Sequence, residues 1–439
     1  MDLSALLERP SKPSAEVGID RPCTVLLPTL GSAGDVHPVL AVARKLRARG
    51  HRPVVVTSSW FERACRDEGI EFEQLLPDAA FERAARDPDI WHPWRGFRVL
   101  ARDVIVPAMR PLFEIVERRA EQTDDLVVAS SVLCLGARLA HEKLGVPQVS
   151  MHVQPVVLRS REDRVGTPHL HFPRTGPRWQ KDLAYAVADA AIIDPALCPE
   201  LNAYRNWLGL PRVRRPFDGW IHSTQRVVGL WPDWYAPVQP DWPDDVTLTD
   251  FPLFDPGEDA PLDPAVQDFL GAGSPPVVFT GGSANVHMDE LLRAGLRSCR
   301  ASGERGLFLL PEPESLGPLP DGFAAFGFTP LGALLPHCRA VVHHGGIGTT
   351  ARVLRSGLPQ VVVPHSHDQP DNALRVEALG AGAVVPSAKL DGKRLEAALR
   401  RELNRDRTAA PIAAHVAGSA DGPGDAAAAI TRLVRDSRV

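Results

Sequence analysis

Short apolar runs alternate with amphipathic stretches in two separate parts of the 439-residue chain, and this alternation limits the possible folds more than any other feature. In the first part, buried strands are predicted at Thr24–Leu27, Pro53–Thr57 and Leu126–Ala129, with apolar residues at helical spacing between them. The alternation then stops, begins again at Pro276 and continues through Ala340–His343. Strands that alternate with helices form a parallel sheet covered by helices on both faces. The sequence therefore predicts an α/β protein with two doubly wound lobes.

Changes in composition divide the chain into five segments. Residues 1–20 are polar and contain prolines, and we expect a flexible N-terminal tail. The N-terminal lobe is predicted to cover residues 21–230, a Pro- and Trp-rich linker residues 231–260, and the C-terminal lobe residues 261–415. Residues 416–439 form a C-terminal segment with a final helix that could pack back on the N-terminal lobe.

Composition and charge exclude several classes of protein. The net charge of −5 argues against a nucleic-acid-binding surface over the whole chain. The six cysteines form no Cys-x-x-Cys pair, and we expect free thiols in a reducing compartment. The start of the chain lacks the pattern of a secretion signal, and no apolar run approaches the roughly 18 residues of a membrane span. We therefore expect a cytoplasmic protein without a transmembrane segment.

The first candidate site is the turn after the strand Thr24–Leu27. Gly31 and Gly34 allow a tight turn, and a helix is predicted to begin after Pro38. Ligands of doubly wound sheets lie at the carboxyl ends of strands, so Asp35 would point its carboxylate into a cleft. Alternatively, Asp35 only caps the following helix. A dinucleotide site is disfavoured, because the run lacks Gly-x-Gly-x-x-Gly.

The second candidate site follows the buried strand Ala340–His343. Free backbone N–H groups and the positive end of the next helix suit a phosphate or diphosphate. His343 or His344, if protonated, would add positive charge without a metal, and Thr349 could add a hydroxyl donor. The backbone could approach a ligand closely at three glycines, Gly345, Gly346 and Gly348. The alternative is an ordinary glycine-rich turn between a strand and a helix.

The third candidate site comes at the end of the next predicted strand. Asp368 and Gln369 offer a carboxylate and an amide, a pairing suited to the vicinal hydroxyls of a sugar. The competing interpretation is a helix N-terminus capped by Asp368 or Asp371. Because the two strands follow each other in the sequence, we expect the phosphate and hydroxyl ligands to meet in one site.

The two lobes and these three motifs resemble the nucleotide-sugar-dependent glycosyltransferases of the GT-B fold, especially bacterial natural-product and rhamnolipid-type enzymes and sterol glucosyltransferases. The resemblance extends over nearly the whole chain from about Pro22. It is strongest where His344-Gly-Gly-Ile-Gly-Thr-Thr350 and Asp368-Gln369 stand at the family's spacing. It implies two Rossmann-like lobes that face a cleft.

The resemblance also implies roles for the donor-binding residues. His344 and the amides of Gly348 and Thr349 would hold the diphosphate, and Asp368 and Gln369 would hold the sugar hydroxyls. The nucleobase would lie near Phe328. The nearby loop with Gly282 and Ser283 would meet the phosphate or the acceptor.

Two positions depart from the pattern of related enzymes. Leu331 stands where many relatives carry Gln against the base. Arg352 stands where many carry a ribose-binding Glu. The resemblance therefore assigns no ribose-binding residue in this chain.

The expected reaction is transfer of a hexose, with inversion, from a UDP- or dTDP-sugar to a hydroxyl of a small, partly apolar acceptor. Asp35 is the candidate general base. Gly34, His37 and His152 are further cleft candidates, with His37 expected to point away from the cleft. All nine Trp and all three Tyr lie between Trp60 and Trp242, which predicts an aromatic acceptor surface in that part of the chain.

No metal and no cofactor are expected, since the nucleotide sugar is a co-substrate and the helix end stabilises its leaving group. Two alternatives remain open. One is a non-catalytic partner that binds nucleotide sugars. The other is a GT-B hydrolase or epimerase that acts on the nucleotide sugar itself.

Overall fold

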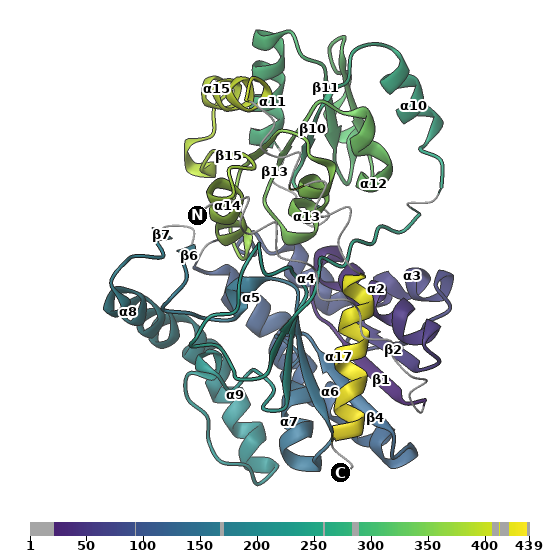
Figure 1. Cartoon of the computed structure of the whole chain (residues 1–439), viewed down its shortest axis with the longest axis vertical. Coiled ribbons are helices and arrows are strands. Elements are labelled where there is room, and N and C mark those ends of the chain that lie inside the picture. Colours follow the sequence, from purple (N-terminus) through teal and green to yellow (C-terminus); the bar gives the residue numbers. More distant parts are fainter. Residues whose placement is uncertain are drawn as a thin grey trace.

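The computed structural model describes residues 22–92, 94–166, 171–257, 260–282, 289–405, 412 and 421–436. They form two α/β lobes stacked along the long axis of the molecule, with the C-terminal lobe at the top of Figure 1. The prediction of two doubly wound, Rossmann-like lobes is confirmed. Among the described residues, no helix combines the length and the apolar character needed to cross a membrane.

The N-terminal lobe is built on a parallel sheet with the strand order β3-β2-β1-β4-β5-β8-β9. Its strands are β1 (Thr24–Pro28), β2 (Arg52–Thr57), β3 (Glu71–Gln74), β4 (Leu126–Ser130), β5 (Gln148–His152), β8 (Arg226–Gly229) and β9 (Val246–Leu248). Val25 and Leu27 of β1 belong to the core on one face of the sheet, and Leu26 belongs to the core on the other. Because both faces are covered, the central strands read as continuous apolar runs.

Helices cover both faces of this sheet. The helices of this part of the chain are α2 (Ala33–Ala48), α3 (Glu62–Asp67), α4 (Asp78–Arg86), α5 (Gly96–Leu100), α6 (Val106–Gln122), α7 (Leu135–Leu144), α8 (Arg178–Ala188) and α9 (Asp194–Trp207). A short antiparallel pair, β6 (Val165–Gly166) and β7 (His171–Phe172), lies beside the C-terminal lobe.

The C-terminal lobe repeats the plan with the parallel order β12-β11-β10-β13-β14-β15. Its strands are β10 (Val277–Thr280), β11 (Gly306–Leu309), β12 (Phe323–Phe326), β13 (Ala340–His343), β14 (Gln360–Val362) and β15 (Ala383–Val384). Its helices are α10 (Pro264–Gly271), α11 (Asp289–Ser302), α12 (Leu331–Leu334), α13 (Ile347–Ser356), α14 (Gln369–Ala378) and α15 (Gly392–Leu403).

The segment predicted as a linker, residues 231–260, serves only partly as a connection. β9 lies inside it and extends the first sheet beside β8. Trp231, Trp234 and Trp242 are buried in a core that continues from the N-terminal lobe into α13 and α14. The connection proper begins after β9. Its prolines and tryptophans indicated a loop, whereas burial of the indole rings depends on contacts with distant segments.

The end of the chain returns to the N-terminal lobe. Helix α17 (Gly422–Asp436) packs against α2, β4 and β8, as the yellow helix of Figure 1 shows. Lys45 and Asp421 form an ion pair of 2.7 Å, and the Arg49 guanidinium donates to the Gly424 carbonyl. The final helix therefore closes one face of the first sheet.

Candidate active site

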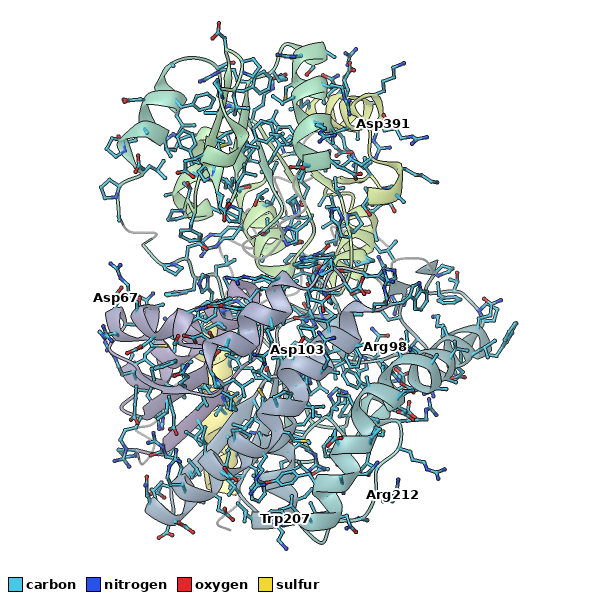
Figure 2. The ribbon with its side chains drawn as sticks, turned by 180° about the vertical axis from the view of Figure 1, so that it is seen from behind. Asp67, Arg98, Asp103, Trp207, Arg212 and Asp391 are labelled. Carbon is cyan, nitrogen blue, oxygen red and sulfur yellow. The ribbon has the colours of Figure 1, made fainter. Side chains whose placement is uncertain are left out.

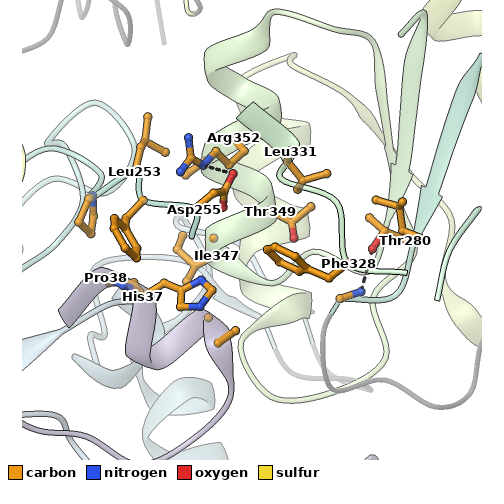
Figure 3. Close-up of a pocket in the computed structure, with 18 of the residues that line it drawn as sticks. His37, Pro38, Leu253, Asp255, Thr280, Phe328, Leu331, Ile347, Thr349 and Arg352 are labelled. Atoms are coloured by element: carbon orange, nitrogen blue, oxygen red, sulfur yellow. Dashed lines mark hydrogen bonds and ion pairs between the residues drawn. The ribbon is translucent and has the colours of Figure 1, made fainter. Parts of the chain in front are cut away.

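A cavity of about 380 Å³ lies between the lobes. Its walls come from the loops that follow β1, β5, β8, β10, β11, β12 and β13, together with the connection after β9. Figure 3 shows His37 and Pro38 entering from α2, Thr349 and Phe328 from the C-terminal lobe, and Asp255 from the connection. The carboxyl ends of both sheets thus face each other, which is where doubly wound folds bind ligands.

The first turn of α13 opens into this cavity. Gly348 and Thr349 line it, while the N–H of Ile347 donates to Asp368 Oδ2 at 3.2 Å. Gly345 and Gly346 do not line it. The Gly345 N–H donates to the His343 ring at 3.1 Å, and its φ of +91° places it against Val362 with no room for a Cβ. Of the predicted glycine-rich turn, only the helical part reaches the cavity.

The His344 ring is buried between two glycines. A Cβ on Gly282 or on Gly346 would come within 2.7 Å of the ring. Burial lowers the pKa of His344 to about 3, with smaller contributions from His343 and His365, so the imidazole is neutral at pH 7. The idea of a protonated histidine is therefore wrong for the ligand-free protein, because the ring is enclosed by a loop from another strand. Burial also lowers the pKa of His343, to about 4.

Asp368 connects α14 to α13 instead of capping its own helix. Its Oδ2 accepts from the Ile347 N–H and, at 2.7 Å, from Asn372 Nδ2. Asp371 does not cap the helix either, since it pairs with Arg375 at 2.7 Å. Burial first, and then the charge of Asp35, raise the pKa of Asp368 to about 7. The two carboxylates, from opposite lobes, thus lie within electrostatic reach of each other.

Gln369 is 2% exposed and does not line the cavity. Its Oε1 accepts the N–H groups of His365 at 2.8 Å and Ser366 at 3.2 Å. The amide oxygen therefore stabilises the loop before α14.

Asp35 forms a capping box at the start of α2. Its Oδ2 accepts the Ser32 N–H at 2.9 Å, and Ser32 Oγ accepts the Gly34 N–H. The helix therefore begins at Ala33, whereas the sequence predicted a start after Pro38. Pro38 lies inside the helix and cannot donate to the Gly34 carbonyl.

The position of Asp35 at the start of α2 determines which of its oxygens is free and how basic the carboxylate is. Asp35 Oδ1 accepts no hydrogen bond from the described part of the chain. Burial raises the pKa of Asp35 to about 6, against the lowering effect of the Ser32 hydrogen bonds. The carboxylate is thus a helix cap with a stronger basicity than usual. Asp35 itself does not line the cavity, whereas Gly34 does.

Of the two candidate histidines of the N-terminal lobe, His37 lines the cavity and His152 does not. His37 was expected to point away from the cleft but lines the cavity, in edge contact with Phe61 and Phe254. His152 is 1% exposed and hydrogen-bonds to His222 at 3.0 Å inside the lobe, so it does not reach the cavity. Burial keeps the pKa of both imidazoles below its usual range, that of His37 at about 4.

The remaining predicted residues fall into two groups. Phe328 lines the cavity and is 66% exposed, Leu331 lies beside it, and Gly282 lines the wall with a φ of +82°. Ser283 lies outside the described residues.

No tryptophan or tyrosine lines the described cavity, whose phenylalanines are Phe251, Phe254 and Phe328, and the expected Trp and Tyr surface for an acceptor stays a prediction. Three tryptophans are core residues, as described above. Trp207 is 67% exposed but lies at the end of the N-terminal lobe remote from the C-terminal lobe (Figure 2).

Sequence reasoning missed two features of the site. Arg352 forms an ion pair with Asp255, Nε to Oδ2 at 3.3 Å, and Asp255 belongs to the connection between the lobes. The Tyr235 hydroxyl donates to Asn372 Oδ1 at 2.8 Å, and Asn372 in turn donates to the Gly345 carbonyl and Asp368. No local pattern marks Asp255 or Tyr235. Asn372 could have been found as a polar residue one turn after Asp368.

Comparisons with known proteins agree with the two-lobed site. Residues 25–160 match the glycosyltransferase family 28 N-terminal domain, and residues 311–429 match the erythromycin biosynthesis protein CIII-like C-terminal domain. The O-mycaminosyltylonolide 6-deoxyallosyltransferase of Streptomyces fradiae is 30% identical over 414 residues, which cover 86% of this chain and 89% of the relative. The chain belongs to the GT-B glycosyltransferases of the natural-product type.

Solved structures support the fold of this GT-B glycosyltransferase. The glycotransferase of kitacinnamycin superposes with a TM-score of 0.71 at 20% identity, covering 94% of this chain and 99% of the other. The glycosyltransferase VinC, solved in complex with dTDP, gives a TM-score of 0.66 at 20% identity, covering 94% and 100%.

Proposed function

We propose that this glycosyltransferase transfers a hexose, with inversion, from a UDP- or dTDP-sugar to a hydroxyl of a small, partly apolar acceptor. One observation carries the proposal. The first turn of α13 and the exposed ring of Phe328 face the same interlobe cavity, so it offers a diphosphate site and an aromatic face for a base. The dTDP complex of VinC supports a nucleoside diphosphate as the ligand class.

The diphosphate would lie against the N–H groups of Gly348 and Thr349. These groups and the positive end of the helix stabilise negative charge as it develops on the leaving group. His344, being neutral, would contribute as a hydrogen-bond partner and not as a cation. Neither a metal ion nor a cofactor is needed for this step.

The acceptor hydroxyl would lose its proton to Asp35. Its oxygen would then attack the anomeric carbon from the face opposite the diphosphate, as the bond from that carbon to the diphosphate oxygen breaks. Single displacement of this kind inverts the anomeric centre. A base with a pKa near 6 is still ionised at pH 7 and binds a proton more strongly than an ordinary Asp. From the opposite lobe, Asp368 would orient the sugar together with the Nε2 group of Gln369, because the Oε1 of Gln369 is already engaged by the loop before α14.

A donor-by-acceptor screen read by mass spectrometry tests the proposal. We expect an acceptor mass increased by one hexose residue, and NMR of product and donor should show opposite anomeric configurations. Release of free sugar without any acceptor would instead indicate a hydrolase. Binding of the nucleotide without turnover of any donor would indicate a non-catalytic partner protein.

A further inference from the structure

An ion pair stands in the wall of the interlobe cavity. Arg352 is 7% and Asp255 14% exposed in their side chains, and both line the cavity (Figure 3). Asp255 Oδ2 also accepts the Gly332 N–H at 3.1 Å, beside Leu331. Its other oxygen, Oδ1, accepts no hydrogen bond from the described residues. A carboxylate held at one oxygen presents the other in a fixed direction.

The position of this pair along α13 relates it to the diphosphate. Arg352 lies three residues after Thr349 and four after Gly348, so the three residues share one face of the helix. At 1.5 Å of rise per residue, Arg352 is roughly 5 Å further along the axis. In a nucleoside diphosphate, the ribose is the group next to the α-phosphate. With the diphosphate at Gly348 and Thr349, and the base toward Phe328, the ribose comes opposite the Arg352–Asp255 pair.

The chemistry of the pair fits ribose hydroxyls. A carboxylate only accepts hydrogen bonds, and sugar hydroxyls are donors of the matching kind. A lone carboxylate near a diphosphate would repel it, whereas the Arg352 guanidinium neutralises Asp255. Hydrogen bonds to charged groups are also stronger than those between neutral groups.

We propose that Asp255, clamped by Arg352, binds the ribose hydroxyls of the donor nucleotide. This inference rests on the proposed function, because it needs a nucleoside diphosphate in the cavity. It makes the connection between the lobes part of the donor site. The pair then selects for the hydroxylated face of the nucleoside, independently of which sugar is transferred.

Calorimetric titration with matched nucleotides tests the proposal. UDP is compared with 2′,3′-dideoxy-UDP, and dTDP with 3′-deoxy-dTDP, on wild type and on Asp255→Asn. Wild type should bind the hydroxylated nucleotide about tenfold more tightly or better, the effect of a hydrogen bond to a charged group. In Asp255→Asn, which keeps the shape of the side chain, this preference should shrink to about threefold or less. The matched control is Asp263→Asn, since Asp263 caps α10 on the same connection and should leave the preference unchanged.

Each outcome decides the matter. An unchanged preference in Asp255→Asn, or no preference in wild type, overturns the role of Asp255 while the nucleotide site stands. If neither UDP nor dTDP binds to wild type, the proposed function fails and the inference fails with it. Should Asp255→Asn not fold, Arg352→Gln releases the clamp with Asp255 in place and should also reduce the preference. If the pair were purely structural, the substitutions would change thermal stability and would weaken binding of the hydroxylated and the deoxygenated nucleotide equally.

Discussion

The Tyr235 hydroxyl, from the segment between β8 and β9 of the first sheet, donates a hydrogen bond of 2.8 Å to Asn372 in the C-terminal lobe. Asn372 also donates to Asp368 Oδ2, so a residue near the lobe junction orients the carboxylate proposed to hold the sugar. Tyr235 is 3% exposed, and the contact is buried. Donor alignment therefore depends on how the lobes are docked.

Tyr235→Phe removes this hydroxyl and leaves Asn372 Oδ1 unsatisfied. We expect kcat/KM to fall by about tenfold because the sugar is misaligned, with a loss of about 1 kcal/mol in stability. Steady-state kinetics and chemical denaturation measure the two effects. Tyr204→Phe is the control, since its buried hydroxyl bonds no described residue and lies outside the cavity. Equal kinetics for both variants would contradict the role of Tyr235.

Asp35→Asn should lower kcat by about two decades or more while donor affinity stays near that of wild type. The pKa of Asp35 is raised from 3.8 to about 6 in the folded protein. Ionisation of Asp35 therefore lowers the stability of the protein as the pH rises between these two values. At pH 7 the variant should therefore be at least as stable as wild type. A stable variant that retains most of its kcat would remove Asp35 from the mechanism and direct attention to His37.

The pH profile provides a second measure of the same group. The ionised form of Asp35 acts as the base, so kcat/KM should rise with pH through about 6 and level off above neutrality. The pKa of Asp368 is raised to about 7, so the acid limb belongs to the coupled pair. In Asp35→Asn the residual rate should lose most of this dependence. A falling rate over the same range would contradict the assignment.

His344→Ala should weaken free UDP or dTDP and the intact donor together, by about 1.5–3 kcal/mol for a lost hydrogen bond to a charged group. Because burial lowers the pKa of His344 to about 3, no proton is lost from it between pH 6 and 8. Calorimetric affinity for UDP-glucose or dTDP-glucose should accordingly be flat in that range. An affinity that falls toward pH 8 in wild type, but not in His344→Ala, would mean that the ligand protonates the ring.

Asp368→Ala should leave the free nucleotide bound nearly as in wild type, yet impair binding of the sugar donor and especially kcat/KM. The Asp368 carboxylate also accepts the Ile347 N–H at the start of α13. Any loss of nucleotide affinity in this variant therefore measures how far the position of α13 depends on Asp368. Titration with nucleotide and with a non-reactive donor analogue separates the effects. If nucleotide binding falls as much as in His344→Ala, Asp368 supports the phosphate helix and not the sugar.

Turnover should be complete in EDTA, because the helix end replaces a metal at the diphosphate. The assay compares rates with EDTA and with added Mg²⁺. Activity that disappears in EDTA and returns with Mg²⁺ would disprove this assignment.

Much of the architecture is encoded locally. The period of apolar residues identifies strands such as β1 and β13, and parallel strands put their carboxyl ends on one edge. Hence the sequence alone predicts that the turns after Leu27 and His343 lie beside a cleft. The apolar spacing of Phe97–Gln122 predicts one long amphipathic helix. The structure instead has α5, a π-helical turn at Ala101–Ile105 and α6, so local periodicity did not predict this interruption.

The tertiary structure alone decided the state of the site. The amino-acid sequence by itself placed His344 and Asp368 at adjacent strand ends, but their pKa values depend on burial by segments far along the chain, such as the loop with Gly282. Asp255 reaches Arg352 across about a hundred residues, a distance over which spacing carries no information. Periodicity reports which side of an element is buried. Which segment buries a given side chain is determined only when the lobes come together. The charge and the chemistry of that side chain therefore depend on the tertiary structure.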